Sequence, residues 1–498
     1  MTDMLRFVSE SRATPEKRAP ELRREDFAEI YRGFQEAQAE AQASRCSQCG
    51  VPFCSSGCPL GNHIPDWLRL AAEGEMREAY ELSAATSNMP EICGRICPQD
   101  RLCEGSCVIE QSGHGTVTIG AVEQYITDYA WKMGWVESVR PRRERAQTVG
   151  IVGAGPAGLS AADQLRSLGY QVTVYDRYDR AGGLLTYGIP GFKLEKEVVM
   201  RRVQRLREMG VAFVQNADVG GETPFAEVRA KHDAALIATG VYKARDLSVP
   251  GAGSTGVVRA LDYLTASNRK GFGDHVPGFE AGHLNAKGKR VVVVGGGDTA
   301  MDCVRTAIRQ DAASVTCLYR RDRENMPGSA REVANAEEEG IEFRWLSNPK
   351  LLLGDAEQLS GVRVARMRLG APDQSGRQSP EEVPGETDDL GADMVIKALG
   401  FSPEDLPGAF GEPGLELTRW GTIKADPASF QTSLPGVFAA GDIVRGASLV
   451  VWAIHDARKA AAGMDAYLRG LGAAEDVMTV GRQETAYDPQ AYAPVAAE

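Results

Sequence analysis

Eight of the ten cysteines lie between Cys46 and Cys107, a density that points to metal chemistry. Clustered cysteines indicate disulfides in a small secreted protein, but metal ligands in an enzyme of a reducing compartment. They form two runs, spaced by two, four and three residues in the first and three, five and three in the second: Cys46, Cys49, Cys54 and Cys58, then Cys93, Cys97, Cys103 and Cys107. We expect two [4Fe–4S] clusters, because two structural zinc sites would favour paired C-x2-C units and only one such pair occurs.

A proline follows Cys58 and Cys97, as in cluster-binding runs. In two-cluster ferredoxins the fourth cysteine of a run ligates the other cluster. By that rule Cys46, Cys49 and Cys54 would share one cluster, and Cys58 would belong to the second. The two cysteines outside the runs are expected to be small buried hydrophobic residues: Cys303 and Cys317.

A glycine-rich turn after the strand-like run TVGIV predicts a dinucleotide site. Gly153, Gly155 and Gly158 form G-x-G-x-x-G before a predicted helix, whose N-terminus would face a pyrophosphate. A second strand, QVTVY, leads to Asp176, about 20 residues on, where a carboxylate would accept the ribose hydroxyls. The alternative is a purely structural glycine-rich turn.

Two later segments favour FAD over NAD at this first turn. They are LIATG (236–240) and GVFAAGDI (436–443), in which Asp442 closes a buried strand before a helix that we expect near Ser448. Asp442 would hold the ribityl-pyrophosphate region, or would only cap that helix. The segment GGLLTYGIPGFKL (182–194) would lie along the flavin ring with Lys193 near its polar edge, unless it is a surface loop. The expected FAD contacts are Gly153, Gly155, Pro156, Ala157, Gly158, Asp176, Gly183, Leu184, Lys193, Thr239, Gly240, Gly441 and Asp442.

A second turn, G-x-G-x-x-A, predicts a separate site for NADPH. The following strand, SVTCLY, leads to Arg320 and Arg321 instead of an acid. Guanidinium groups there would pair with a 2′-phosphate, which a carboxylate would repel. The alternative is that one or both arginines face solvent, Arg321 more readily. The expected NADPH contacts are Gly295, Gly297, Asp298, Thr299, Ala300, Arg320 and Arg321.

These motifs need two kinds of scaffold. Residues 1–137 are predicted to be mostly helical, because residues 23–46 and 64–88 place apolar side chains three and four apart. A basic stretch, residues 138–147, would be a linker or a solvated charge run. Beyond it, the strand-like runs TVGIV, QVTVY, AALIA, RVVVV, SVTCLY, MVIKA and GVFAA alternate with helical stretches, which predicts doubly wound α/β architecture.

The fold class is therefore an α-helical iron–sulfur domain followed by two Rossmann-like domains, with the NADPH domain inserted in a discontinuous FAD domain. The expected boundaries are 1–145 for the cluster domain, 146–253 and 404–498 for the FAD domain, and 254–403 for the NADPH domain.

Bulk composition excludes several classes. A net charge of −12 and a pI near 5.3 argue against nucleic acid as the main partner. The sequence contains no run of about 18 apolar residues, so we expect no membrane span. The N-terminus has no secretory signal pattern. We therefore expect a cytoplasmic protein.

The segments CSQCGVPFCSSGCPLGNHIPDWL, PEICGRICPQDRLCEGSCV and HGTVTIGAVEQYI resemble the small (β) subunits of bacterial NADPH-dependent glutamate synthases. The likeness extends over essentially the whole chain, through YGIPGFKL, GGGDTAMDC and GVFAAGDI. The chain is also similar to the N-terminal half of dihydropyrimidine dehydrogenase and to NADPH:ferredoxin transhydrogenase-type subunits.

The resemblance implies a different ligand count from the one that the spacing predicts. Cys93 would be spare, and a non-cysteine ligand in the segment IGAVE, Glu123, would complete the second cluster. The implied first set is Cys46, Cys49, Cys54 and Cys107, and the second is Cys58, Cys97, Cys103 and Glu123.

The resemblance implies an NADPH-oxidising glutamate synthase small subunit, an oxidoreductase of the class that acts on CH–NH2 donors with NADP as acceptor. Hydride from NADPH would pass to FAD, and electrons would leave through two [4Fe–4S] clusters to a large (α) subunit in a hetero-oligomer, for glutamate synthesis from glutamine and 2-oxoglutarate. We expect no catalytic side chain, because the cofactors carry the chemistry. The alternatives are an NADPH–acceptor oxidoreductase with another partner, such as an NADPH:ferredoxin-type subunit, and a non-enzymatic redox-sensing module.

Overall fold

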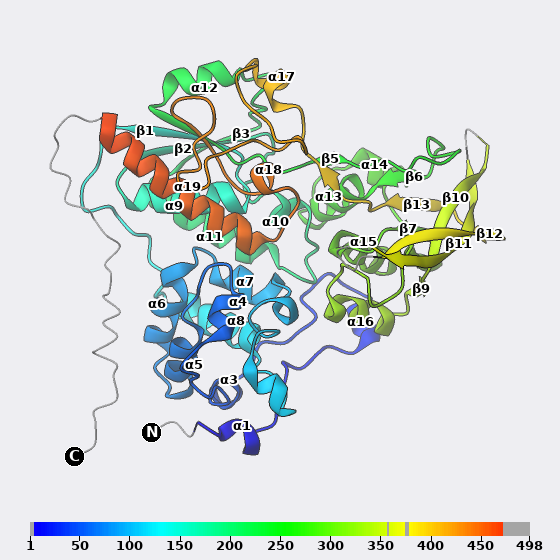
Figure 1. Cartoon of the computed structure of the whole chain (residues 1–498), viewed down its shortest axis with the longest axis horizontal. Helices are drawn as coiled ribbons and strands as arrows, with labels where there is room; N and C mark the ends of the chain where they lie inside the picture. Colours follow the sequence, from blue (N-terminus) through cyan, green and yellow to red (C-terminus); the bar gives the residue numbers. More distant parts are fainter. Residues whose placement is uncertain (1–3, 356–357, 374–377, 472–498) are drawn as a thin grey trace.

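A helical N-terminal part and two α/β units make up the chain (Figure 1). The computed structural model describes residues 4–355, 358–373 and 378–471. Residues 472–498 of the predicted FAD domain lie outside the described residues. No described helix combines the length and the apolar character needed to cross a bilayer.

The helical part packs around the cysteine runs. The predicted helical stretch 64–88 forms two helices separated at Gly74, whose φ of +82° interrupts the helical backbone. The prediction for 23–46 is wrong over its first half, because residues 24–35 are not helical and Ile30 instead packs against another unit. The elements are α1 (Arg6–Ser9), α2 (Pro20–Arg23), α3 (Glu36–Ala43), α4 (Phe53–Gly57), α5 (Ile64–Ala72), α6 (Met76–Thr86), α7 (Pro90–Ile96), η1 (Gln99–Arg101), η2 (Val108–Ser112) and α8 (Ile119–Lys132).

The linker is less solvated than its charges suggest. Arg145 is buried, and its Nε donates a 2.8 Å hydrogen bond to the carbonyl of Leu168. This part of the linker therefore docks on the first α/β unit.

The first α/β unit is a parallel sheet in the order β15-β4-β1-β2-β3. The four strands predicted for it are confirmed, and the last of them joins the sheet from far along the chain, so this unit is discontinuous. Its strands are β1 (Thr148–Val152), β2 (Gln171–Asp176), β3 (Ala212–Gln215), β4 (Ala234–Ile237) and β15 (Val437–Ala439). Its helices are α9 (Pro156–Ser167), α10 (Leu184–Tyr187), α11 (Lys196–Glu208), α12 (Phe225–Lys231), α17 (Leu406–Phe410), α18 (Asp442–Arg445) and α19 (Val450–Leu471).

The second unit lies between β4 and β15 in sequence and contains a parallel sheet in the order β6-β13-β7-β8-β9. The three strands predicted for it are confirmed: β7 (Arg290–Val294), β8 (Ser314–Leu318) and β13 (Met394–Lys397). The others are β6 (Val257–Arg259) and β9 (Glu342–Arg344), and its helices are α13 (Ala260–Gly271), α14 (Pro277–Glu280), α15 (Asp298–Arg309) and α16 (Ala330–Glu338).

Two smaller sheets complete the fold. One is antiparallel and comprises β10 (Ser347–Gly354), β11 (Leu359–Pro372) and β12 (Gln378–Gly391). The other is a ribbon of β5 (Lys243–Ala244) and β14 (Phe401–Ser402), which pairs the two chain segments that cross between the α/β units. The mixed α/β class is therefore as predicted, with this antiparallel addition.

Candidate functional site

The glycine turn after β1 has the shape that a pyrophosphate requires. A Cβ on Gly153, whose φ is +106°, would lie 2.4 Å from the carbonyl oxygen of Ala238, and one on Gly158 would lie 1.9 Å from that of Gly153. Around Gly155, by contrast, a Cβ would meet no atom within 4 Å. The first and third glycines are therefore needed for packing, and the second leaves open space at the N-terminus of α9.

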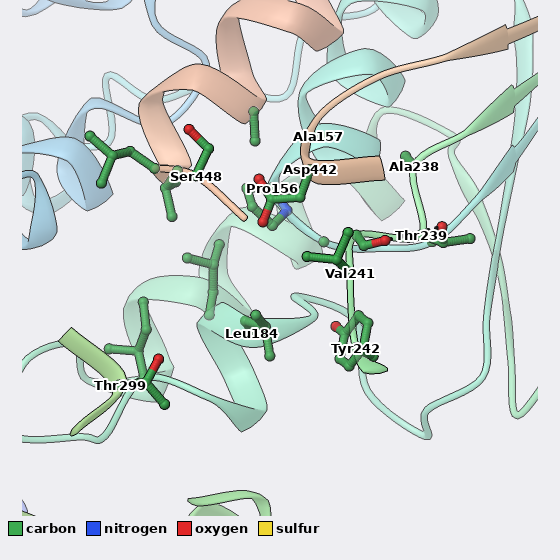
Figure 2. A pocket seen from close by; sticks show the side chains of 18 of the residues that line it. Pro156, Ala157, Leu184, Ala238, Thr239, Val241, Tyr242, Thr299, Asp442 and Ser448 are labelled. Carbon is green, nitrogen blue, oxygen red and sulfur yellow. Dashed lines mark hydrogen bonds between the residues drawn. The ribbon is translucent and has the colours of Figure 1, made fainter. Parts of the chain in front are cut away.

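That open space belongs to a large cavity of about 280 Å³ between the two α/β units. Figure 2 shows Asp442 beside Pro156 in this cavity, with Leu184 and Thr299 farther along it. The predicted cofactor residues that line it are Gly153, Gly155, Pro156, Ala157, Asp176, Leu184, Lys193, Thr239, Gly240, Asp298, Thr299 and Asp442. Among the described residues, the predicted ones outside its lining are Gly158, Gly183, Gly295, Gly297, Ala300, Arg320, Arg321 and Gly441.

Two carboxylates flank the first turn. Asp176 accepts hydrogen bonds from the amides of Ala154 at 2.6 Å and Tyr178 at 2.8 Å, so it braces the turn itself. Burial raises the pKa of Asp442 to about 6, against a hydrogen bond from the Ser448 backbone that lowers it. The helix predicted near Ser448 begins slightly later, as α19 at Val450, and the short α18 begins at Asp442 itself.

The helix that follows the second glycine turn borders the same cavity through Asp298 and Thr299, whereas the glycines of the turn lie outside its lining. A Cβ on Gly295 would lie 2.2 Å from the carbonyl oxygen of Ala398, which explains the glycine there. At the start of α15, the carboxylate of Asp298 accepts a 3.0 Å hydrogen bond from the Ser329 amide. The cavity is thus bordered by the N-termini of α9 and α15, one from each unit.

Lys193 lines the cavity, but its ammonium group is already paired. Its Nζ lies 2.9 Å from Oδ1 of Asp302 and 3.8 Å from Oε2 of Glu332. Burial would lower the pKa of Lys193, but these carboxylates outweigh it and raise the pKa above its usual value. If Lys193 lies beside a flavin ring, Asp302 and Glu332 lie there with it. Neither of these two carboxylates was predicted from the sequence.

The predicted phosphate-binding arginines lie beyond the lining of the cavity. Strand β8 ends at Leu318, and Tyr319 separates it from the pair. Arg320 is exposed, whereas Arg321 is half-buried and its Nε has no hydrogen-bond partner among the described residues. Arg320 is therefore the more exposed of the two, although Arg321 was expected to face solvent more readily.

The cysteines gather around two small cavities. The first, of about 20 Å³, is lined by Cys46, Cys49, Cys54 and Cys107, which is the first set that the resemblance implies. Burial raises the pKa of Cys46 to about 12, so an unligated thiol there is neutral. Within the described chain no three Cys, His, Asp or Glu side chains converge on a single-ion site.

The second small cavity, of about 30 Å³, is lined by five potential ligands: Cys58, Cys93, Cys97, Cys103 and Glu123. Glu123 accepts hydrogen bonds from Ser83 Oγ at 3.1 Å and Asn62 Nδ2 at 3.4 Å. Burial raises the pKa of Glu123 to about 8. Both candidates for the fourth ligand, Cys93 and Glu123, thus lie at this cavity.

Cys97 joins the two kinds of site, because it lines both the second small cavity and the large one. Cys97 was predicted only as a cluster ligand. The lining also includes Pro98, noted in the sequence only as part of a cluster-binding run, and Ser448, noted only as an expected helix start. The lining residues that carried no sequence signal include Ile96, Tyr178, Tyr242, Ser329, Arg331 and Val450.

Comparison with known proteins agrees with this layout. Residues 23–135 match the family described as dihydropyrimidine dehydrogenase domain II, 4Fe-4S cluster, and residues 147–457 match pyridine nucleotide-disulphide oxidoreductases. The glutamate synthase [NADPH] small chain of Azospirillum brasilense is 62% identical over 94% of this chain and 96% of its own length. The chain belongs to the glutamate synthase small-chain family.

Other members of the family support the same assignment. The glutamate synthase [NADPH] small chain of Escherichia coli is 46% identical over 93% of this chain and 98% of its own length. The putative oxidoreductase AegA of the same organism is 45% identical over 91% of this chain but 69% of its own length. The predicted assignment as an oxidoreductase with an iron–sulfur domain before a pyridine nucleotide domain is confirmed.

The solved structure of Mycobacterium tuberculosis FprA in complex with NADPH is similar in fold to this chain. It superposes with a TM-score of 0.55 at 20% identity, over 66% of this chain and 85% of that one. At this identity the match concerns the fold alone.

Proposed function

We propose that this protein is the NADPH-oxidising, electron-transferring subunit of a glutamate synthase. Hydride would pass from NADPH to FAD, and electrons would leave singly through two [4Fe–4S] clusters to a large subunit for glutamate synthesis from glutamine and 2-oxoglutarate. The observation that carries the proposal is Cys97, which lines both the large cavity and the second cysteine cavity. An electron leaving the large cavity would meet the second cluster there.

The side chains would bind and orient the cofactors. The open space at Gly155 and the N-terminus of α9 suit the FAD pyrophosphate, and Asp442 suits its ribityl hydroxyls. The N-terminus of α15 with Asp298 and Thr299 suits NADPH at the opposite border of the cavity. Lys193, Asp302 and Glu332 form an ion-paired part of the cavity wall.

The ligand sets follow the cavities. Cys46, Cys49, Cys54 and Cys107 would hold one cluster. The second would take Cys58, Cys97, Cys103 and Glu123, a carboxylate that Ser83 and Asn62 already orient. In the proposed division, residues 1–145 would hold the clusters, 146–253 and 404–498 would hold FAD, and 254–403 would hold NADPH.

The deciding experiment is the visible absorption and EPR spectrum of anaerobically purified protein, combined with iron, sulfide and flavin analysis. We expect one FAD and about eight irons per chain. We also expect NADPH oxidation with an artificial acceptor, whereas an inactive, flavin-free holoprotein would end the proposal.

The partner is tested separately. The relatives named small chains support a large-subunit partner and hence a hetero-oligomer. Affinity purification from the native host should recover a much larger flavin- and iron-containing subunit. Recovery of the active protein with a different partner, and without that subunit, would favour the alternative, an NADPH–acceptor oxidoreductase with another partner.

A further inference from the structure

An N-terminal strap, residues 13–34, runs from the cluster domain to the second α/β unit. The two arms of the strap pair with each other, because Lys17 and Tyr31 form an antiparallel bridge and the Arg18 amide donates a 2.9 Å hydrogen bond to the Ile30 carbonyl. Figure 1 shows this dark-blue part of the chain reaching α16. The strap thus touches a unit that follows it by some 300 residues.

One side of the strap contacts the loop that carries Lys193. The Ile30 amide donates a 3.3 Å hydrogen bond to the Phe192 carbonyl, and the Phe27 and Phe192 ring centroids are 6.2 Å apart. The Glu29 carboxylate accepts a 3.1 Å hydrogen bond from the Glu195 amide. The strap therefore supports the loop on which one wall of the large cavity depends.

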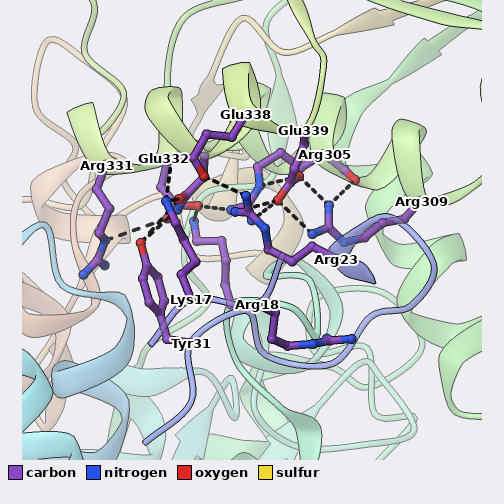
Figure 3. Close-up of polar contacts among 12 residues, drawn as sticks. Lys17, Arg18, Arg23, Tyr31, Arg305, Arg309, Arg331, Glu332, Glu338 and Glu339 are labelled. Atoms are coloured by element: carbon purple, nitrogen blue, oxygen red, sulfur yellow. Dashed lines mark hydrogen bonds and ion pairs between the residues drawn. The ribbon is translucent and has the colours of Figure 1, made fainter. Parts of the chain in front are cut away.

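The other side of the strap inserts a buried arginine into the second unit (Figure 3). Arg23 has no exposed surface, and its Nη2 donates a 2.6 Å hydrogen bond to Glu338 while Nη1 lies 3.4 Å from Glu339. Lys17 donates to the same Glu338 at 2.6 Å. The strap is thus tied to the C-terminal end of α16 by two cations.

From Glu339 the charges continue to the cavity. Arg305 donates to Glu339 at 2.8 Å and to Glu332 at 2.5 Å, and Glu332 lies 3.8 Å from Lys193. The guanidinium groups of Arg305 and Arg309 also lie 4.5 and 4.0 Å from the centroid of the Phe192 ring. A continuous buried network therefore links Arg23 to the cavity residues Glu332 and Lys193.

The strap is one of several contacts that join the two α/β units. Their two backbone crossings pair through the short ribbon of β5 and β14, around which one unit could turn relative to the other. The ion pair Arg180–Asp274, at 2.8 Å, also bridges the units, but it is partly exposed and therefore weak. The Lys193–Asp302 pair also joins the units and is largely buried. The strap adds the Arg23–Glu339 contact, in which neither side chain is exposed.

We propose that Arg23 is a positioning residue that sets the NADPH-binding unit against the flavin loop. Without Arg23 the buried Glu339 still pairs with Arg305 and Arg309, so the effect is expected on geometry. Hydride transfer depends on such geometry, since a misplacement of about 1 Å can cost about 100-fold in rate. The inference rests on the proposed function, because it takes NADPH and FAD to meet in the cavity.

The test compares wild type with Arg23→Ala, Arg23→Lys and Arg32→Ala. Arg32 is the matched control, because it pairs with Glu16 inside the strap with both side chains largely exposed. Three quantities are measured well below the unfolding temperature: hydrogen exchange of α15 and α16 without nucleotide, the Kd of NADP+, and the rate of flavin reduction at saturating NADPH.

For Arg23→Ala we expect full flavin and iron content, faster exchange in α15 and α16, and flavin reduction slowed about tenfold or more, with the Kd of NADP+ within about threefold. Arg23→Lys should recover part of the rate, and Arg32→Ala should match wild type. If Arg23→Ala does not fold, Glu338→Gln, which alters the more exposed partner, should change exchange and rate in the same direction.

A reduction rate within about twofold of wild type, even with a lowered Tm, would overturn the inference and leave only a structural role. Unchanged exchange in α15 and α16 would overturn it as well. A wild-type flavin that NADPH does not reduce would instead overturn the proposed function, and this inference with it, so the two failures are distinguishable.

Discussion

The hydroxyl of Ser83 donates a 3.1 Å hydrogen bond to Oε1 of Glu123, a carboxylate that is only 9% exposed. This bond holds Glu123 at a cavity that also contains Cys58, Cys97 and Cys103. A bound carboxylate needs such outer partners to keep its orientation. We therefore propose the pre-oriented Glu123 as the fourth ligand in place of the neighbouring Cys93.

Replacing the cysteines separately should identify the spare one. We expect Cys93→Ser to retain both clusters, with about eight irons per chain, and Cys97→Ser to lose one cluster and about half of the iron. The measurement is iron and sulfide content with EPR of the reduced protein. Glu123→Ala should resemble Cys97→Ser, whereas the exposed Glu110→Ala should resemble wild type. Cluster loss in Cys93→Ser would contradict the Glu123 assignment.

Substitutions at two glycines of the first turn should have different effects, one on FAD binding and the other on the stability of the fold. Gly155 has a φ of −74° and open space around its Cβ position, so Gly155→Ala should fold as well as wild type but bind FAD at least about tenfold more weakly. In Gly158→Ala the new methyl would lie 1.9 Å from the Gly153 carbonyl oxygen, which should cost about 3 kcal/mol of stability. Flavin absorbance per chain and thermal unfolding measure the two effects. Normal FAD binding by Gly155→Ala would argue against a pyrophosphate at this turn.

Most of the parallel framework could be predicted from sequence because buried strands are continuously apolar. β12 could not, since its residues QSPEEVPGETDDLG contain acids and prolines. Those acids pair across the strands with basic side chains such as Arg363, which lies 2.7 Å from Asp389. Pairing with a neighbouring strand, which propensity does not describe, builds this sheet.

The candidate site was predictable where one segment makes it and unpredictable where distant segments meet. The glycine turns and the cysteine runs are local patterns. The contact of Lys193 with Asp302, by contrast, joins two units and leaves no local pattern. Residues 24–35 show the opposite error, because Phe27 and Ile30 have helical spacing but serve a tertiary contact.

The two arginines after β8 should determine nucleotide preference. A charged hydrogen bond to a 2′-phosphate is worth about 1.5–3 kcal/mol, so Arg320→Ala should raise KM for NADPH about 10- to 100-fold and leave KM for NADH unchanged. Arg321→Ala should have a similar but smaller effect, because this half-buried side chain has less freedom to reach the ligand. Steady-state kinetics with both nucleotides measure the ratio. Equal losses with NADPH and NADH would show that neither arginine reads the phosphate.

Lys196 should make stability rise with pH. Its ammonium donates hydrogen bonds to the carbonyls of Leu185, at 3.1 Å, and Ile189, and burial lowers the pKa of Lys196 to about 7. Between this value and the usual pKa of lysine the unfolded chain binds the extra proton, so the folded state gains stability as pH rises. Because the Lys196 side chain is only partly buried, we expect the free energy of unfolding to increase by about 1–2 kcal/mol between pH 7 and pH 9.

Thermal unfolding of wild type and Lys196→Met at several pH values isolates this contribution, because all other groups cancel in the difference. The Tm of wild type should rise relative to that of Lys196→Met as pH increases from 7 to 9. Lys231→Met, at a lysine with a 62% exposed side chain, should run parallel to wild type. Parallel curves for wild type and Lys196→Met would mean that Lys196 keeps its charge through this range, held by the two carbonyls that it contacts.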